Sequence, residues 1–408
     1  MHNMKILYYH QYFSTPRGAG GTRSYEMARR LIARGHQVTM VCCQAQGGVT
    51  GLHTAFVHGR RDGCVDGIRV IELELPYSNY DSLTQRSLTF LKFAARSTLL
   101  AFQQEYDLLF ATSTPLTAGI PGIFSRFFKR KPFVFEVRDL WPELPKEMGV
   151  ISNPLILKAL DVLEWLSYHT ATACIGLSPG IVKGIVRRGI LPEHVAMIPN
   201  GCDLDLFKPD QGEVLRPTGV SKTDFLAVFC GAHGLANGLD AVLDAAAELK
   251  QRGRKDIRMV FIGDGRLKPG LMNRAQKQKL DNCVFIDPVP KLKLISYLRG
   301  ADAGLMILAD VPAFYYGTSP NKIFDYISMG LPVLNNYPGW LADMITEHGC
   351  GIAVPPENPV AFADALEKMA EEPALIRQMG QNARILAAER FDRTILSNRF
   401  ADFLEQVA

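Results

Sequence analysis

Short apolar runs alternate with amphipathic segments through the first half of the chain. The runs 4–10 and 37–43 have the length and apolar character of buried strands, and the segment 24–34 between them has the periodicity of a helix. The glycine-rich segment 44–67 is predicted to be a loop. More strands are expected at 68–73, 107–112, 132–137, 171–177 and 195–198, with helices at 82–103, 116–129, 154–168 and after Ser178. This alternation predicts a parallel sheet covered by helices.

The alternation stops near residue 200 and starts again after a polar stretch. Pro199, Asn200 and Gly201, followed by a polar run to about residue 222, indicate a domain boundary. Beyond it, strands are expected at 225–230, 257–262, 283–287, 303–308, 332–335 and 351–354, with helices between them and at 358–371, 373–389 and 393–406. The sequence thus predicts an α/β fold of two doubly wound, Rossmann-like domains, residues 1–200 and 201–392, facing each other across a cleft.

The segment 310–332, DVPAFYYGTSPNKIFDYISMGLP, is expected to be an aromatic loop followed by a clearly delimited helix. Ser319 suits the N-cap, and Pro320 suits the first helical position. Gly330 and Pro332 are typical of the end of a helix. The free N–H groups and the positive dipole end of such a helix can form a binding site for phosphate.

Polar residues near the start of this helix carry the chemistry that a nucleotide needs. Asp325 follows Lys322 by three positions and Asn321 by four, so the side chains share one face. A cation with helix amides can hold a diphosphate, and a carboxylate one turn later can accept hydrogen bonds from ribose hydroxyls. An ordinary capped helix with a surface Lys322–Asp325 ion pair explains the same pattern equally well.

Glycine-rich loops follow three of the predicted strands. The first contains Gly20 and Gly21 and precedes a helix, so its amides can approach a phosphate. It lacks the G-x-G-x-x-G spacing, and no acid ends the next strand, which argues against a nicotinamide or flavin domain. The loops CGAHGLANG, with His233, and FIGDG, with Gly263, have the same placement. Tight turns, and for His233 simple solvation, are the alternatives.

Arg138 and Asp139 follow the predicted strand 132–137 directly, in the sequence RDLWPE. A charged pair and a tryptophan at the carboxyl end of a strand have the placement of a functional site. A turn with a structural tryptophan is the alternative. Asp203 and Asp205 have the D-x-D spacing of some metal–nucleotide sites, but their position after Asn-Gly favours turn chemistry, and no metal is expected.

Charge and cysteine content narrow the class of protein. Lys and Arg number 45 against 41 Asp and Glu, so the net charge of +4 says little about partners. The eight cysteines form no C-x-x-C pair, which favours free thiols in a reducing compartment over zinc. The first residues lack the pattern of a signal peptide, and no apolar run approaches the roughly 20 residues that span a bilayer. A cytoplasmic location is expected.

Two segments combine basic and apolar residues. The predicted helix 82–103 contains no acid and carries Arg86, Lys92 and Arg96 among leucines and phenylalanines. The segment 123–132, IFSRFFKRKP, has the same character. This combination suits docking on an anionic membrane surface. A core helix with a polar edge explains the first segment equally well, and favourable cations at a helix end explain the second.

The order of these motifs resembles that of family four glycosyltransferases with the GT-B fold. The resemblance covers nearly the whole chain and rests on Gly20-Gly21, ARRLIARGHQVTMV, RDLWPE, GLSPGI, IPNGCDLDLF, FIGDG and PNKIFDYISMGLPVL. The variants EVRDLWPE, GAHGLANGLDAVLDAA and SPNKIFDY look like the branch that adds amino sugars during O-antigen or capsule assembly, with N-acetyl-fucosamine transferases as the most similar type.

The resemblance implies a retaining transferase that needs neither a metal nor a cofactor. It would move an N-acetylated deoxyhexosamine from a UDP-sugar to a polyprenyl-diphosphate-linked acceptor at the cytoplasmic face of the inner membrane, with no nucleic-acid partner. Residues 1–200 would bind the acceptor, with the helix 393–408 packing back on them, and residues 201–392 would bind the nucleotide sugar. A non-enzymatic two-domain nucleotide- or sugar-binding protein is the alternative.

The resemblance also assigns residues to a site. Asp139, Lys322 and Arg138 would be catalytic. The nucleotide sugar would be bound by Gly20, Gly21, Asn200, His233, Asn237, Gly263, Phe285, Ser319, Asn321 and Asp325. The first of the family's two acids falls at Gly317, and its usual Arg and Lys fall at Ala232 and Asn237, so these groups are missing. Lys322 is therefore expected to hold the diphosphate.

Overall fold

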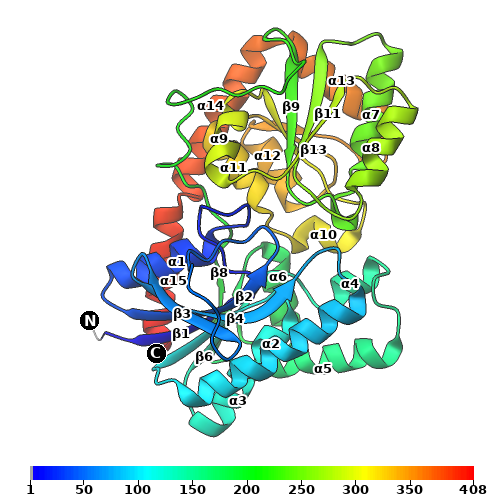
Figure 1. The fold of residues 1–408 in the computed structure, drawn as a ribbon. Coiled ribbons are helices and arrows are strands. Elements are labelled where there is room, and N and C mark those ends of the chain that lie inside the picture. The colour runs from blue at the N-terminus through cyan, green and yellow to red at the C-terminus, as the bar shows by residue number, and fades with distance from the viewer. Residues whose placement is uncertain (1–2) are drawn as a thin grey trace. The chain divides into compact units, whose positions relative to one another are not determined.

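The computed structural model describes residues 3–408 (Figure 1). The chain divides into two compact units. Unit 1 holds the chain up to Asn200, the short segment Tyr316–Ser319 and the end of the chain from Thr394. Unit 2 holds Gly201–Tyr315 and Pro320–Arg393. Each unit contains a sheet of mostly parallel strands, which confirms the predicted class of two Rossmann-like α/β domains.

The sheet of unit 1 has eight strands. They are β1 (Lys5–Tyr9), β2 (Gln37–Ala45), β3 (Arg60–Val65), β4 (Ile68–Tyr77), β5 (Leu108–Thr112), β6 (Phe133–Val137), β7 (Ala173–Gly176) and β8 (Val195–Met197). Their spatial order is β3-β4-β2-β1-β5-β6-β7-β8, and only β3 pairs antiparallel. Every residue of β5 and β6 is buried, as expected for parallel strands covered on both faces. The order reverses beside β1, which places the ligand-binding edge of this sheet there.

Helices follow most strands of unit 1. They are α1 (Arg23–Ala33), α2 (Leu83–Gln103), η1 (Leu116–Gly119), α3 (Ile120–Phe124), η2 (Ser125–Lys129), α4 (Glu143–Glu147), α5 (Pro154–Thr170), α6 (Pro179–Arg187), η3 (Pro192–His194) and α15 (Arg393–Val407). The helix expected at 116–129 is thus a 3₁₀ turn, an α-helical turn and a π-helical turn in succession. Ser82, Asn153 and Ser178 cap α2, α5 and α6 with their side chains. Within residues 3–408, none of the helices has the length and apolar character that a membrane span requires.

The predicted loop 44–67 is wrong in its second half, because residues 60–65 form the edge strand β3. This strand pairs with β4 through a two-residue turn at Asp66 and Gly67, whose φ angles are +50° and +85°. Its sequence, RRDGCV, is too polar to stand out as a strand. A polar strand is stable at the edge of a sheet, where its outer side faces water.

The sheet of unit 2 has six parallel strands in the order β11-β10-β9-β12-β13-β14. The strands are β9 (Phe225–Cys230), β10 (Ile257–Ile262), β11 (Cys283–Ile286), β12 (Ala303–Met306), β13 (Val333–Asn335) and β14 (Gly351–Ala353). The helices are η4 (Leu235–Asn237), α7 (Asp240–Gln251), α8 (Lys268–Lys277), α9 (Lys291–Arg299), α10 (Pro312–Gly317), α11 (Asn321–Met329), α12 (Trp340–Glu347), α13 (Pro359–Glu371) and α14 (Pro373–Arg390). The last two residues of α10, Tyr316 and Gly317, belong to unit 1. Apolar side chains of β9, β10 and β12 pack against α7 and α13 to form the core.

The segment 310–332 differs from its prediction in two ways. The expected aromatic loop contains the short helix α10. Ser319 does not cap α11, because the helix starts at Asn321, Pro320 occupies the N-cap position, and no side chain caps the helix. The Ser319 hydroxyl instead accepts a hydrogen bond from the N–H of Asn200 at 3.3 Å, within unit 1. No side chain among residues 3–408 therefore caps the first-turn amides of α11.

Candidate functional site

In unit 2, the loops after β9 and β10 approach each other closely at two glycines. The N–H of Gly231 donates to Ile262 O at 3.0 Å, and the N–H of Gly263 donates to Ile286 O at 3.1 Å. Gly263 has a φ of +146°, and a Cβ there would lie 1.9 Å from Gly231 O. Only glycine fits at position 263, so these loops present backbone rather than side chains at the carboxyl ends of the strands.

Lys322 lies beside these loops, in the first turn of α11. Its ammonium donates to Asn237 Oδ1 at 2.6 Å and lies 4.3 Å from the ring centroid of Phe229. Burial lowers the pKa of Lys322 to about 7. A lysine whose charge titrates near neutral pH thus lies at the N-terminal end of a helix that has no side-chain cap. This arrangement favours the binding of an anion. Asn321, the first residue of α11, is half-buried at the same helix end.

Asp325 lies one turn further along α11 and pairs with a lysine other than the predicted one. Its Oδ1 accepts a hydrogen bond from Lys291 Nζ at 3.1 Å. Burial raises the pKa of Asp325, although Lys291 opposes this shift. The alternative of a surface Lys322–Asp325 ion pair is wrong, because Asp325 is buried and the two side chains have different partners.

Lys291 belongs to a buried chain of charges that sequence reasoning missed. Besides Asp325, its ammonium donates to Asp203 Oδ2 at 3.1 Å. Arg393 also pairs with Asp203 and donates to Gly201 O at 2.6 Å. Burial would lower the pKa of Lys291, but Asp325 and Asp203 outweigh it and raise the pKa. Asp203 is thus an ion-pair partner as well as a turn residue. Its partners, Lys291 and Arg393, are too far away in the sequence for a local pattern to predict the pairing.

His233 is buried rather than solvated at the surface of its loop. Its ring centroid lies 6.0 Å from that of Phe229 and 6.3 Å from those of Phe261 and Phe285. Neither ring nitrogen has a partner within residues 3–408, and burial lowers the pKa to about 4. The side chain is therefore a neutral imidazole at pH 7, with one N–H donor and one acceptor nitrogen that no described residue uses. Phe285 stacks on Phe261 with 4.6 Å between centroids.

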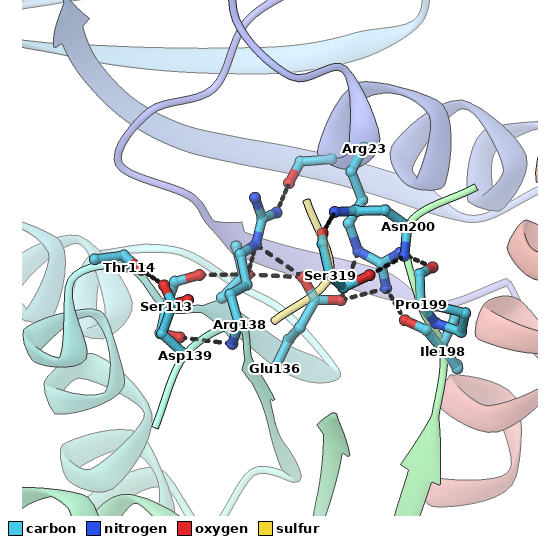
Figure 2. A network of polar contacts seen from close by, with 12 residues as sticks. Arg23, Ser113, Thr114, Glu136, Arg138, Asp139, Ile198, Pro199, Asn200 and Ser319 are labelled. Atoms are coloured by element: carbon cyan, nitrogen blue, oxygen red, sulfur yellow. Dashed lines mark hydrogen bonds and ion pairs between the residues drawn. The ribbon is translucent and has the colours of Figure 1, made fainter. Parts of the chain in front are cut away.

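Unit 1 contains a buried ion pair between the start of α1 and the end of β6 (Figure 2). Arg23 Nη2 and Nε donate to Glu136 Oε2 at 2.8 and 3.1 Å. The same guanidinium donates to Pro199 O at 2.6 Å and to Ile198 O at 2.9 Å. Both side chains are almost completely buried, so Arg23 joins three separate segments of the chain in one network.

Arg138 extends this network at the carboxyl end of β6 (Figure 2). Its Nε donates to Thr112 Oγ1 at 2.7 Å and to Glu136 Oε1 at 3.2 Å, and its Nη2 donates to Ser24 Oγ at 3.0 Å. Burial would raise the pKa of Glu136, but Arg23 and Arg138 outweigh it and hold the pKa below its ordinary value. Arg138 is thus largely occupied by the protein.

Asp139 follows Arg138 and is oriented by a neighbouring hydroxyl. Thr114 Oγ1 donates to Asp139 Oδ2 at 2.9 Å (Figure 2). Burial raises the pKa of Asp139, with Thr114 and then Arg138 opposing the shift. The other carboxylate oxygen has no hydrogen-bond donor within residues 3–408, so it remains open to a substrate hydroxyl.

The glycine loop of unit 1 ends in free backbone donors. Ala19 donates to Gly47 O at 2.9 Å, but the N–H groups of Gly20 and Gly21 make no hydrogen bond in the part of the chain that the structure describes. Thr22 occupies the N-cap position of α1, yet its side chain caps nothing. These amides are therefore free to donate to an anion, and their role in binding a phosphate stays a prediction.

The predicted site residues fall into separate groups. Gly20, Gly21, Arg138 and Asp139 lie in unit 1 near the carboxyl ends of β1 and β6, and Asn200 with Ser319 also belongs to unit 1. Unit 2 brings together His233, Asn237, Gly263, Phe285, Asn321, Lys322 and Asp325. Asn200 Nδ2 donates to Ser319 O at 2.5 Å, and its Oδ1 is buried without a partner among the described residues.

Two family models match the chain. A glycosyl transferase 4-like domain matches residues 18–201, and the model for glycosyl transferases group 1 matches residues 210–386. The chain is 25% identical over 182 residues to alpha-D-kanosaminyltransferase from Streptomyces kanamyceticus, which covers 45% of this chain and 46% of the relative. It is 27% identical over 205 residues to D-inositol 3-phosphate glycosyltransferase from Pseudarthrobacter chlorophenolicus, covering 48% and 46%. The alignments thus span about half the length of these relatives.

Solved structures with the same fold cover nearly the whole chain. Sucrose-phosphate synthase from Thermosynechococcus elongatus has a TM-score of 0.76 at 17% identity, over 99% of both chains. Alr3699/HepE from Anabaena in complex with UDP-glucose has a TM-score of 0.68 at 18% identity, over 99% of this chain and 100% of that one. WaaG, a glycosyltransferase involved in lipopolysaccharide biosynthesis, has a TM-score of 0.68 at 16% identity, over 97% and 98%. With its two family domains on two Rossmann-like units, this chain belongs to the glycosyltransferases of the GT-B fold.

Proposed function

We propose that this protein is a retaining glycosyltransferase that takes its sugar from a UDP-sugar. The observation that carries the proposal is Lys322, a half-buried lysine at a helix end that no side chain caps, one turn before the buried Asp325. The ammonium and the first-turn amides of α11 are suited to a diphosphate, and Asp325 is suited to ribose hydroxyls. The fold is shared with a protein solved in complex with UDP-glucose.

The same groups support a mechanism without a metal. The leaving nucleoside diphosphate develops negative charge, which a lysine and preorganised helix amides stabilise. His233 adds one neutral donor from the interior of unit 2. The acceptor hydroxyl then attacks from the face that the leaving group vacates, as retention requires, and no side chain is assigned as a covalent nucleophile.

The acceptor proposed here is a polyprenyl-diphosphate-linked saccharide in O-antigen or capsule assembly, and the donor sugar is an N-acetylated deoxyhexosamine. The motif variants described above support this choice, as does the shared fold with WaaG. Asp139 would accept a hydrogen bond from an acceptor hydroxyl through its open oxygen. A small polyol phosphate is the competing acceptor, because a relative is named D-inositol 3-phosphate glycosyltransferase.

Transfer assays with matched variants test this function. UDP release would be followed with a panel of UDP-sugars, with a polyprenyl-diphosphate saccharide or inositol phosphate as acceptor. Lys322→Ala and Asp325→Ala should each lower kcat/KM by at least about 100-fold, because each removes a charged contact. Lys293→Ala, which changes an exposed lysine of α9, should keep full activity. Full activity in both site variants would disprove the assignment, and binding of UDP-sugars without any transfer would favour a non-enzymatic binding protein.

A further inference from the structure

The outer face of α2 carries an apolar stripe. Leu88, Leu91, Leu99 and Phe102 recur at helical spacing and are 51%, 57%, 62% and 44% exposed. Ala95, also exposed, fills the gap between them. The stripe runs for about 21 Å at 1.5 Å per residue. Phe93 and Leu100 of α2 are buried in the core of unit 1, and Lys92 is exposed, so the alternative of a core helix with a polar edge is correct for part of this helix but does not account for the exposed apolar stripe.

Phenylalanines from the neighbouring turns continue this stripe. Phe124, Phe127 and Phe128 are 42%, 62% and 70% exposed. The ring centroid of Phe128 lies 6.2 Å from that of Phe102 on α2 and 5.9 Å from that of Phe124. We call Phe102, Phe124, Phe127 and Phe128 the aromatic patch. Phe128 joins Phe102 and Phe124 in one cluster of exposed rings, and Phe127 is exposed beside it in the sequence. Such a group of rings is unusual on a surface that faces only water.

The basic residues around the aromatic patch differ in how the fold uses them. Lys129 donates to Ala101 O at 3.0 Å and Gln104 O at 2.9 Å, so it satisfies the end of α2. In contrast, Arg126, Arg130 and Lys131 make no hydrogen bond or ion pair with any described residue. Neither α2 nor the segment 116–132 contains an acid. Arg126, Arg130 and Lys131 are therefore free cations beside the patch, and the acid nearest to it along the chain, Glu105, is paired with Lys5.

We propose that the α2 stripe, the aromatic patch and Arg126, Arg130 and Lys131 form a docking face for an anionic lipid surface. A bilayer interface accepts rings and leucines at the depth of the headgroups while lipid phosphates neutralise the cations. Pairing of this face with the same face of a second copy would bring like charges together. Binding to a lipid surface, unlike binding of a peptide, needs no ordered groove. The face supplies the membrane contact that a lipid-linked acceptor requires, but it depends on unit 1 alone and not on sugar transfer.

Vesicle co-sedimentation with the full chain and no substrate tests the proposal. The protein should bind vesicles of phosphatidylcholine mixed with phosphatidylglycerol, bind phosphatidylcholine alone weakly, and lose binding as salt rises. Arg126→Gln/Arg130→Gln/Lys131→Gln should weaken binding to the anionic vesicles about 100-fold. Phe127→Ser/Phe128→Ser should weaken it by roughly the same factor, because two rings no longer enter the interface.

Matched controls lie on unit 2. Lys255→Gln/Lys277→Gln/Lys279→Gln removes the same charge from exposed positions, and Leu292→Ser/Ile385→Ser removes exposed apolar side chains. Both control variants should bind vesicles like the unchanged protein. Equal binding by the patch variants and the controls would overturn the proposal, as would self-association in solution that the patch variants abolish. Transfer to a detergent-solubilised acceptor, measured separately, distinguishes loss of docking from failure of the proposed enzymatic function.

Discussion

The charge of Lys322 is set by its surroundings rather than by the solvent. Burial against Phe229 lowers its pKa to about 7, so the ammonium form loses its dominance as the pH rises through neutrality. An anionic diphosphate would favour the charged form again. Binding of the nucleotide sugar is therefore coupled to uptake of a proton, since the ligand prefers the protonated lysine.

This coupling predicts a pH dependence of donor binding. The affinity for a UDP-sugar should fall by up to about tenfold for each pH unit above about 7, because the neutral lysine must first take up a proton. Calorimetry in buffers of different ionisation enthalpy would measure this uptake. Lys322→Arg keeps the charge at all these pH values and should flatten the dependence. Proton uptake that is the same in the unchanged protein and the arginine variant would contradict the role of Lys322.

Asp325 is expected to recognise the ribose, and a nucleotide analogue can separate this role from a structural one. Asp325→Asn should weaken UDP binding by roughly 10- to 100-fold, because a neutral amide is a poorer acceptor than a carboxylate. It should also bind UDP and 2′-deoxy-UDP with similar affinity, whereas the unchanged protein prefers UDP. Titration calorimetry with both nucleotides measures this preference, and Asp343→Asn, at an exposed position on α12, is the control. An undiminished preference in Asp325→Asn would mean that the ribose is held elsewhere.

At the scale of elements, local patterns predicted the strands well. The bounds of β9 and β10 agree with the predicted 225–230 and 257–262, because both are short apolar runs between clear breaks. The edge strand β3 was missed because its sequence is polar, and α10 was missed because its aromatic and glycine residues are typical of loops. A strand or helix without a strong pattern is fixed by its neighbours in space, which the sequence does not reveal.

The candidate site shows the same division between local and distant interactions. Lys322 and Asp325 were found from their spacing on one helix. The pairing of Asp325 with Lys291, 34 positions away, had no signal in the sequence, and neither did the pairing of Arg23 with Glu136, 113 positions away. The burial of His233 also depends on phenylalanines from three strands. Local spacing therefore indicated these candidate residues, whereas the ion pairs and burial around them could not be predicted from the sequence.

The junction of α1 and β6 is expected to be a major source of stability for unit 1. Glu136→Gln should lower the free energy of unfolding by about 3–5 kcal/mol, because it leaves the buried Arg23 without a counter-charge. Because the pKa of Glu136 is lowered in the folded protein, its ionised form stabilises the fold at pH values above the ordinary pKa of 4.5. This contribution is lost as the pH falls through the lowered pKa of the folded state. Urea unfolding at neutral and acidic pH measures both effects. Glu74→Gln on β4, an exposed position, should change little, and an equal effect of both substitutions would contradict the assignment.

At the scale of the molecule, the two units offer different chemistry to different partners. Unit 2 gathers Lys322, Asp325 and the neutral His233 around glycine loops, which suits a nucleotide diphosphate. Unit 1 carries the outward face of α2 with its aromatic patch and free cations, which suits a lipid surface. The nucleotide-binding residues of unit 2 and the lipid-binding residues of unit 1 do not depend on each other for binding. The two ligands should therefore protect different segments of the chain.

Amide hydrogen exchange should distinguish these two protected segments in the same protein. UDP is expected to slow amide exchange at 231–238 and 321–325, because it contacts the loop after β9 and the first turn of α11. Vesicles of phosphatidylcholine mixed with phosphatidylglycerol are expected to slow exchange at 88–102 and 124–131 instead. The Arg126→Gln/Arg130→Gln/Lys131→Gln variant should lose only the second pattern, and Lys322→Ala only the first. Protection of α2 by UDP alone, or of α11 by vesicles alone, would contradict this separation of nucleotide binding from lipid binding.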